Sequence, residues 1–326
     1  DEQIQQLGLK PHECELFRRY HYRRCFAVPT WADGLGQHTF RTTMLPLSHA
    51  EARAIYNRHN PHQSQFQQSK EEDDHAFQTL KAKLTAALKN FPNGAFVKLD
   101  TRSPKDVPYD ILGPESNPIL KIMVDEELKK IPTDARHPHQ ELIAFGTAAL
   151  KFLKVTTPEK VIELLCQSDR ISQDLGKDLD IPQHLFGTSL VLREWDDRVS
   201  CYPGFEFRGF AHKKKLNAVT QYINCCFFPE VVEKKAEIQA KILDFHEQVK
   251  SLFPHESYVI DFIIMGNEIK IIELNPFYTE TPTDSLDYLL PRWKNYIIST
   301  RPGAVPQPPQ QPATGANTPE WLCTML

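Results

Sequence analysis

The sequence lacks regularly spaced cysteines. Its seven cysteines among 326 residues are scattered, odd in number, and form no CxxC pair. A disulfide framework or a zinc site needs regularly spaced cysteines, so neither is indicated. We therefore expect reduced thiols in a cytoplasmic protein.

Long apolar runs and an excess of basic residues are also missing. No run approaches the roughly 20 apolar residues that span a bilayer, so we expect no membrane span. The net charge is -4 and the pI is near 6.4, whereas nucleic-acid-binding proteins usually carry a basic balance or a basic stripe. A nucleic-acid partner is not favoured.

Several common catalytic motifs are absent as well. The chain has no GxxxxGK[ST] loop and no GxGxxG after a strand, so P-loop and Rossmann nucleotide sites are excluded. It also has no Ser-His-Asp constellation and no HExxH pair. A nucleotide site in this chain would use another arrangement.

What is present is the composition of a globular protein, 40% hydrophobic and 25% charged, in a chain long enough for one large domain or two lobes. Helical and strand-like patterns occur in mixed order, which favours an α+β or α/β architecture over a repeat or a bundle. Helices are predicted at 77–88, 141–152, after Thr157 and at 238–252, and strands at 39–47, 95–99, 189–195, 205–212, 215–223 and on both sides of Gly266-Asn267.

Three segments have compositions that predict little regular structure. Residues 59–75 are polar and are predicted to form a mobile loop, and residues 108–140 are predicted to be an irregular excursion. The Pro-rich tail, 301–326, is predicted to be disordered, and its last four residues, CTML, fit a prenylation box only loosely. The folded domain is expected between residues 10 and 300.

Residues 15–26 (ELFRRYHYRRCF) mix basic and aromatic side chains. The basic residues could mark a surface for a partner. A solvated face, with Phe17, Tyr20 and Phe26 packing inward, is the favoured alternative.

The segment from Tyr258 to Asn275 places two acids inside apolar, β-rich runs. A two-residue loop at Gly266-Asn267 would pair Asp261 with residue 272, whereas a three-residue loop would pair it with Glu273. In the second register Asp261, Glu273 and Asn275 share one face, and their oxygens are the hard ligands that Mg²⁺ prefers. A surface hairpin with alternating charge remains open as the alternative.

Two basic side chains lie in similar apolar surroundings. Lys98 lies within AFVKL and Arg208 within FEFRGF, where a cation is costly unless an anion meets it. Each could instead occupy an outward position on a sheet surface. Taken with the two acids, they favour a site that binds phosphate and metal together.

The order of several motifs resembles the cell-division-cycle-123 family, whose members have an ATP-grasp fold and assist assembly of eukaryotic translation initiation factor 2. The resemblance runs through TFRTTMLPL, FVKLDTRSPKDV, SDRISQDL, LVLREW, PGFEFRGF, VIDF, IIELNPF and TDSLDYLL. It implies two lobes with a nucleotide between them, and ATP and Mg²⁺ as cofactors.

The resemblance also implies roles for individual residues. It implies a phosphate contact at Lys98, an adenine pocket at Arg193, Glu194 and Trp195, a nucleotide-facing pair at Glu206 and Arg208, and metal ligands at Asp261, Glu273 and Asn275. Residues 284–286 fall in the TDSL patch, close to the surface where the family meets its protein client.

The sequence departs from the family at three of these positions. Glu273 stands where aspartate is usual, a longer side chain that can still bind the metal. Glu194 replaces a basic residue beside the adenine pocket, and Tyr222 lies near an expected arginine.

Three functions are compatible with these residues. The first, implied by the resemblance, is an ATP-binding assembly chaperone, a monomer that binds the γ subunit of initiation factor 2. The second is an ATP-grasp ligase that forms an acyl phosphate, in which Arg208 stabilises the transferred phosphoryl group. The third is a scaffold that no longer binds nucleotide; the four polar groups kept in apolar strands argue against it.

Overall fold

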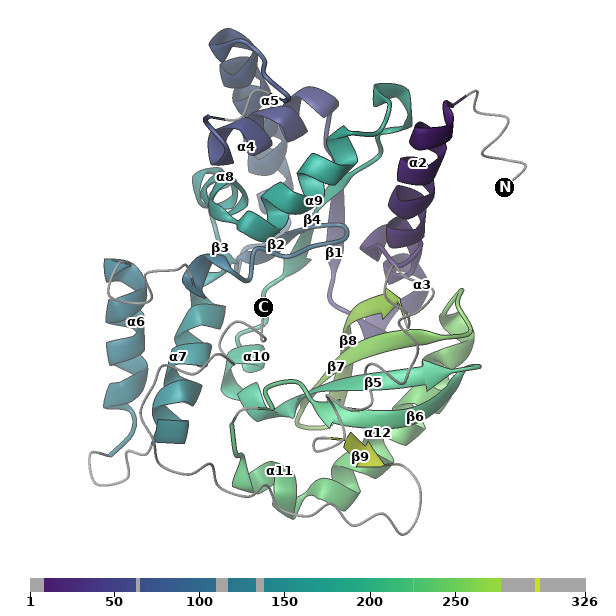
Figure 1. Ribbon diagram of the computed structural model, residues 1–326. Helices are drawn as coiled ribbons and strands as arrows, with labels where there is room; N and C mark the ends of the chain where they lie inside the picture. Colours follow the sequence, from purple (N-terminus) through teal and green to yellow (C-terminus); the bar gives the residue numbers. More distant parts are fainter. Residues whose placement is uncertain are drawn as a thin grey trace, which may run out of the picture.

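The computed structural model describes residues 9–62, 65–109, 117–132, 138–224, 226–276 and 297–299. Within them the chain forms two antiparallel β-sheets, one above the other in Figure 1, with helices on their outer faces. The mixed α/β class expected from the sequence is confirmed. The predictions for residues 284–286 and for the tail from 301 onward lie outside the described residues.

The first sheet has four strands in the order β1-β4-β2-β3. Its strands are β1 (Thr42–Pro46), β2 (Ala95–Leu99), β3 (Lys154–Val155) and β4 (Ser189–Glu194). Each is close to a strand expected from the sequence except β3, which is too short to leave a pattern. Before β2, Gly94 adopts φ +92°, a conformation that glycine reaches without steric cost, and a Cβ there would lie 3.1 Å from the Val155 carbonyl oxygen.

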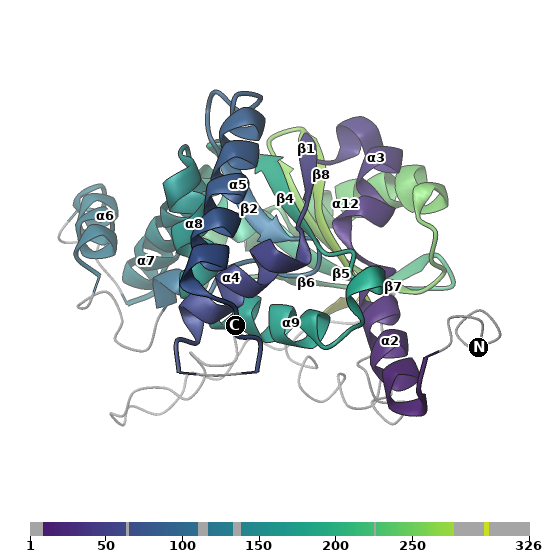
Figure 2. The ribbon, with the colours of Figure 1, turned by 90° about the horizontal axis from the view of Figure 1, so that it is seen from above.

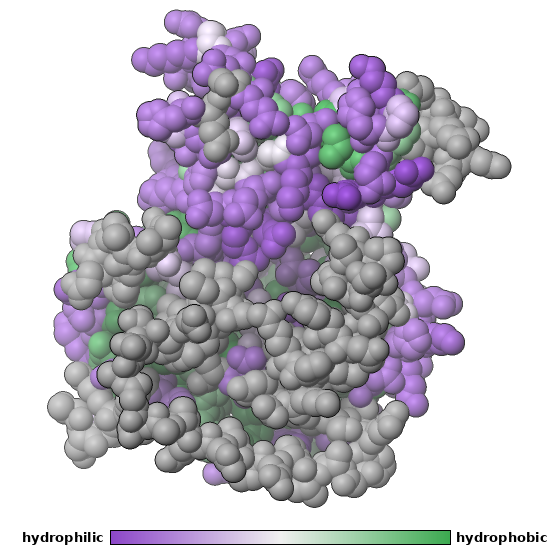
Figure 3. Space-filling view, viewed as in Figure 1, coloured by the Kyte–Doolittle hydropathy of each residue, from purple (hydrophilic) through white to green (hydrophobic). Residues whose placement is uncertain are grey.

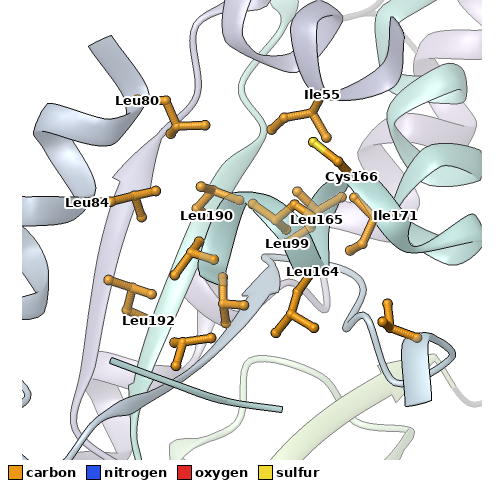
Figure 4. Packing of buried hydrophobic residues seen from close by; sticks show 14 of the residues in the cluster. Ile55, Leu80, Leu84, Leu99, Leu164, Leu165, Cys166, Ile171, Leu190 and Leu192 are labelled. Atoms are coloured by element: carbon orange, nitrogen blue, oxygen red, sulfur yellow. The ribbon is translucent and has the colours of Figure 1, made fainter. Parts of the chain in front are cut away.

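Four helices cover the outer face of the four-stranded sheet. They are α4 (His49–His59), α5 (Lys70–Leu88), α8 (Pro158–Gln167) and α9 (Asp169–Leu179). Leu190 and Leu192 project from β4 toward Leu80 and Leu84 of α5, Leu99 belongs to the same cluster, and all of these side chains are buried (Figure 4). The view from above places α4, α5 and α8 together on one side of the sheet (Figure 2).

The second sheet has five strands in the order β8-β7-β5-β6-β9. Its strands are β5 (Glu206–His212), β6 (Lys215–Gln221), β7 (Tyr258–Met265), β8 (Glu268–Pro276) and β9 (Ile297–Ser299). Helix α12 (Lys235–Val249) covers its outer face, where Phe245 meets Phe262 edge to face with ring centroids 6.4 Å apart. The other, inner face of the five-stranded sheet is directed at the four-stranded sheet.

Most of residues 15–26 lie in helix α2 (Pro11–Arg24), and their contacts fit neither interpretation completely. Tyr20 is buried, as the solvated-face alternative requires. Arg23 and Arg24, however, are not solvated: Arg23 donates to Asp178 over 2.9 Å and Arg24 donates to Asp100 over 2.7 Å. These two arginines therefore tie α2 to the first sheet and to α9.

Two predicted irregular segments contain helix. Helix α5 begins at Lys70, inside the predicted 59–75 loop, because Ser69 and Glu72 form a capping box that starts it early. Helix α6 (Pro118–Lys129) lies inside the predicted 108–140 excursion, and Asn117 caps it by accepting from the Leu120 amide. The high proportion of Pro, Asp and Glu in 108–140 concealed these local signals.

The remaining helices complete the shell. They are α3 (Ala32–Leu35), α7 (Pro138–Phe152), α10 (Arg198–Cys201) and α11 (Pro229–Glu233). The surface over α4 and α5 is mostly hydrophilic, whereas apolar atoms show in the region of α6 and α7 (Figure 3). None of the helices in the described part of the chain is both long and apolar enough to cross a bilayer.

His246 makes the stability of the α12 side depend on pH. It is 1% exposed, its Nε2 lies 2.9 Å from the Tyr258 hydroxyl, and burial lowers its pKa to about 4. The unfolded chain therefore binds a proton that the folded chain does not, between about pH 6.5 and pH 4. Stability should fall as pH falls through this window.

We expect the wild type to lose about 2 kcal/mol more unfolding free energy between pH 7 and pH 5 than His246→Gln, which keeps a hydrogen-bonding group for Tyr258 but does not titrate. Urea unfolding at both pH values measures this difference. His184→Gln, at an exposed histidine, should behave like the wild type. Equal pH dependence in His246→Gln and the wild type would contradict the assignment.

Candidate functional site

A pocket of about 690 Å³, counting the open space at its mouth, lies between the two sheets. Side chains from β2, β4, β5 and β8 reach it, together with residues from the connections between them. The lining residues are Phe40, Phe96, Lys98, Ser103, Lys105, Leu150, Arg193, Glu194, Trp195, Asp196, Val199, Glu206, Ile272 and Glu273. The pocket thus combines an apolar set with a charged set.

The inner face of the four-stranded sheet supplies one wall. Phe96 pairs with Arg193 across β2 and β4, so their side chains share a face, and Lys98 shares it because side chains alternate along a strand. The opposite face carries the leucines of the helical core. Lys98 is therefore only 3% exposed and points inward, which excludes an outward surface position for it.

The inner face of the five-stranded sheet supplies the other wall. In register, Arg208 of β5 is opposite Asp261 of β7, and Asp261 is opposite Glu273 of β8. These three charged side chains form one row across the sheet. The predicted grouping of Arg208, Asp261 and Glu273 is confirmed by this register.

The pairing of β7 with β8 arises from a bulge and not from the three-residue loop that the sequence analysis considered. The hairpin closes on a two-residue loop, with Met265 opposite Glu268, so the three-residue loop is wrong. A β-bulge between Asp261 and Phe262 inserts one extra residue on β8 and shifts the pairing from 272 to 273. The pairing of Asp261 with Glu273 is therefore correct, but the bulge produces it.

Lys98 and Glu273 form an ion pair that joins the two sheets. Burial alone would raise the pKa of Glu273, but the cations of Lys98 and Lys105 hold it at about 2. Burial lowers the pKa of Lys98, and Glu273 opposes that effect. Glu273 is therefore ionised at neutral pH, and its carboxylate favours the charged form of Lys98.

Arg208 and Asp261 form a second, bidentate ion pair within the five-stranded sheet. Nε donates to Oδ1 over 2.7 Å and Nη2 donates to Oδ2 over 2.8 Å. Burial works against the charge of Arg208, but Asp261 raises its pKa. The fork geometry of arginine suits such a pair better than lysine would.

Tyr222 packs against two cations of the site. The Arg208 guanidinium carbon and the Lys105 Nζ each lie 5.0 Å from the centre of its ring. The electron-rich face of the ring attracts both cations. Where the family resemblance implies an arginine near this position, the chain has an aromatic ring that attracts cations contributed by other segments.

Lys105 is the main residue of the charged end that the sequence interpretation missed. Burial works to lower its pKa, but Tyr222, Glu206 and Glu273 raise it above the usual range. The residue lies in a loop after β2, where no strand pattern marks a cation as unusual. Its only sequence signal was its place in the FVKLDTRSPKDV motif.

Glu206 begins β5 and borders the same charged end. Its Oε1 is buried and has no hydrogen-bond partner within the described part of the chain. Burial raises the pKa of Glu206 to about 7, with Lys105 opposing the shift. This carboxyl group therefore accepts a proton far more readily near neutral pH than an exposed glutamate does.

Trp195 forms part of the apolar end, and Glu194 lies beside it at the mouth. The indole Nε1 donates to Asp197 Oδ1 over 2.6 Å, which fixes the orientation of the ring. The Glu194 side chain is 39% exposed, and its nearest cation is Arg41 at 3.8 Å. Phe40, Phe96, Leu150, Val199 and Ile272 complete the apolar lining.

Arg193 lies between the two sheets and is 5% exposed. It donates to the carbonyl oxygens of Ile271 and Ile272 on β8 and, over 2.5 Å, to the Thr39 hydroxyl. Its Nη1 and Nη2 donors are thus directed at the backbone of β8 and at Thr39, and its Nε is buried without a hydrogen-bond partner in the described residues. The residue also borders the pocket.

Asn275 follows Glu273 by two positions and so lies on the same face of β8. Its side-chain nitrogen is buried without a hydrogen-bond partner in the described residues. No group of three His, Cys, Asp or Glu suited to a metal occurs in the described segments. Two carboxylates and one amide oxygen nevertheless make a hard-oxygen set, which fits Mg²⁺.

The described structure therefore brings most of the predicted site residues together. Six of them line the pocket: Lys98, Arg193, Glu194, Trp195, Glu206 and Glu273. Arg208 and Asp261 adjoin it through the charged row across the sheet. Asn275 lies one step further along the same face of β8.

Comparison with solved structures matches this arrangement. The chain resembles Cdc123 from Schizosaccharomyces pombe with a TM-score of 0.53 and 22% sequence identity, over 83% of this chain and 90% of that one. At this identity the likeness concerns the fold. The mixed arrangement of antiparallel sheets and helices is thus one already known.

Comparison of sequences gives a closer relation over part of the chain. A family model described as D123 matches residues 145–301. The "Translation initiation factor eIF2 assembly protein" of Xenopus laevis is 31% identical over 150 residues, 44% of this chain and 43% of that protein. "Cell division cycle protein 123" of Yarrowia lipolytica is 34% identical over 140 residues, 41% of this chain and 36% of that protein. The matched region spans less than half the length of these relatives.

The Lys98–Glu273 pair predicts an asymmetry between its two partners. The Lys98 side chain is 4% exposed and that of Glu273 is 22% exposed. Glu273→Gln leaves a buried cation without its partner and should cost about 3–5 kcal/mol of unfolding free energy. Lys98→Met should cost less, because the freed carboxylate can reach water.

Urea unfolding of the two single variants and of the double variant measures both effects. The double variant should lose less than the sum of the singles, since it leaves no unpaired charge behind. Additive losses would show that the pair does not join the sheets energetically, and a larger loss for Lys98→Met would contradict the predicted asymmetry.

Proposed function

Because this chain is related to the D123 family of Cdc123-like proteins, we propose that it is an assembly factor that binds Mg²⁺-ATP between its two sheets. The observation that carries the nucleotide part is the division of one pocket into an apolar end and a charged end. A nucleotide has the same division, with a flat base at one end and a phosphate chain at the other.

The apolar end suits the base. Trp195 and Phe96 offer aromatic faces, and Phe40 and Ile272 supply further apolar surface. The Asp197 bond to the indole nitrogen holds the Trp195 ring in place before a ligand arrives. Pre-organised aromatic side chains reduce the entropy lost on binding.

The charged end suits phosphates and a divalent cation. Lys98, Lys105 and Arg208 would hold the phosphate oxygens, and Asp261, Glu273 and Asn275 would hold Mg²⁺. The metal, when bound, would neutralise phosphate charge and bring the phosphates and carboxylates together. Glu206, whose Oε1 has no partner within the described residues, is a further candidate to interact with the metal or its water ligands.

The existing ion pairs support this ligand over a simple anion or a metal alone. Each pair, Lys98–Glu273 and Arg208–Asp261, joins one phosphate-type cation to one metal-type carboxylate. A phosphate alone would draw the cations away and leave the two carboxylates without partners. A metal alone would bind the carboxylates and leave the two cations without partners. Mg²⁺-ATP offers a new partner to every member of both pairs, so no buried charge is left uncompensated.

The proposed role in assembly comes from the relatives. The Xenopus relative is named as an eIF2 assembly protein. We infer that this chain also acts in assembly of initiation factor 2 and that its partner is the γ subunit. We also propose that the two sheets belong to the two lobes of an ATP-grasp fold, which close on the nucleotide. The ligase alternative has less support, because the described residues that line the pocket form no separate acceptor site.

Nucleotide binding can be tested by thermal stability. ATP with Mg²⁺ at about 100 times its Kd should stabilise the protein by roughly 2.7 kcal/mol through mass action. Asp261→Asn should lose most of the Mg²⁺-dependent part, because it weakens a proposed metal ligand. Asp244→Asn, at an exposed position of α12, should keep the full response. No response to ATP in the wild type would exclude both the nucleotide-binding chaperone and the ligase.

The partner can be tested by pull-down with purified initiation factor 2 γ subunit. We expect capture by the wild type with Mg²⁺-ATP, reduced capture by Asp261→Asn and full capture by Asp244→Asn. ADP release that depends on a small carboxylate substrate, without γ-subunit capture, would favour the ligase instead.

A further inference from the structure

We propose that Arg193 is a positioning residue that maintains the β-bulge in β8 and thereby keeps Glu273 and Asn275 on the same face of the sheet as Asp261. The inference rests on the proposed Mg²⁺-ATP function for its consequence, but its structural part concerns the protein without a ligand. It differs from the adenine-contact role that the family resemblance implies for this residue.

The bulge decides which side chain of β8 faces the site. From the two-residue loop as far as Phe262 opposite Ile271, the ladder is regular. Continued without a bulge, it would pair Asp261 with Ile272 and turn Glu273 to the other face. The extra residue at the bulge instead pairs Asp261 with Glu273. The shifted pairing continues along β8, where Asn275 lies opposite Val259.

A bulge leaves backbone groups without their ladder partners, and these need other hydrogen bonds when they are buried. The structure supplies them from Arg193 of β4 and from Thr39, which precedes β1. Arg193 Nη1 donates to the Ile272 carbonyl oxygen, and Nη2 donates to that of Ile271 over 3.2 Å. The Thr39 hydroxyl donates to the same Ile271 oxygen over 2.8 Å. The carbonyl groups next to the bulge are thus capped by side chains.

The surroundings of Arg193 fit this role. Arg193 is buried, with only 5% of its surface exposed, and it makes no ion pair within the described residues. An arginine buried without a carboxylate is costly unless strong acceptors meet it, and two neighbouring carbonyl oxygens match the spacing of its fork. Its guanidinium carbon lies 5.1 Å from the Phe40 ring centre and 5.8 Å from that of Trp31. These rings hold the fork against β8.

Three variants test the inference. Arg193→Met removes both donors but keeps much of the side-chain length, and Arg19→Met, on the exposed side of α2, is the matched control. Deletion of Ile272 removes the extra residue, so a regular ladder would itself align Asp261 with Glu273. In that background Arg193 has no bulge to maintain.

The first measurement is amide hydrogen exchange without nucleotide. Arg193→Met should accelerate exchange across residues 269–275 at least about tenfold, and Arg19→Met should leave it unchanged. The deletion variant should restore slow exchange to Arg193→Met. Unchanged exchange in Arg193→Met would overturn the inference, whether or not the protein binds ATP.

The second measurement compares ATP affinity with and without Mg²⁺. In Arg193→Met the gain in affinity from Mg²⁺ should fall by about tenfold or more, as for other residues that orient metal ligands, while metal-free binding changes little. An equal loss of metal-free and Mg²⁺-bound affinity would indicate an adenine contact and overturn the inference. An absence of ATP binding by the wild type would instead refute the proposed function.

The deletion background provides the closing comparison. If Arg193 acts through the bulge, Arg193→Met should not reduce the Mg²⁺-dependent gain further once Ile272 is absent. The same reduction in both backgrounds would show that Arg193 acts on the ligand directly. If the deletion variant does not fold, the exchange and affinity results for Arg193→Met alone decide the matter.

Discussion

The ion pair between Lys98 and Glu273 is the contact on which the site depends. It is the point where a cation from the four-stranded sheet meets an acid from the five-stranded sheet. Each residue lies within a strand whose other face packs into a hydrophobic core, so neither can turn away without exposing apolar surface. The cores therefore hold the charges in position, and the charges in turn join the sheets.

The remaining charged groups share that constraint. Arg208 satisfies Asp261, and Tyr222 faces both Arg208 and Lys105. A low-dielectric gap between two sheets strengthens each of these interactions and makes any unpaired charge expensive. A ligand able to exchange partners with every group at once is therefore the natural occupant, and this is the physical basis of the Mg²⁺-ATP proposal.

The sequence was informative where one residue type was out of place in a regular pattern. Lys98, Arg208, Asp261 and Glu273 stood out because strands of apolar residues surround them. Lys105 did not, because a polar loop hides a lysine. Helices α5 and α6 were misplaced or missed for a related reason: their caps are short signals inside segments with a disorder-like composition.

The sequence by itself determined the mixed α/β class, most strands and the shared face of Glu273 and Asn275 on β8, since alternation along a strand is a local property. Tertiary structure alone decided that a bulge, rather than a longer loop, sets the register of Glu273. It also decided that Arg193 binds the backbone of β8 and that Lys105 joins the charged end. These outcomes depend on how two sheets meet, and the sequence of one strand contains no information about the groups that face it from another sheet.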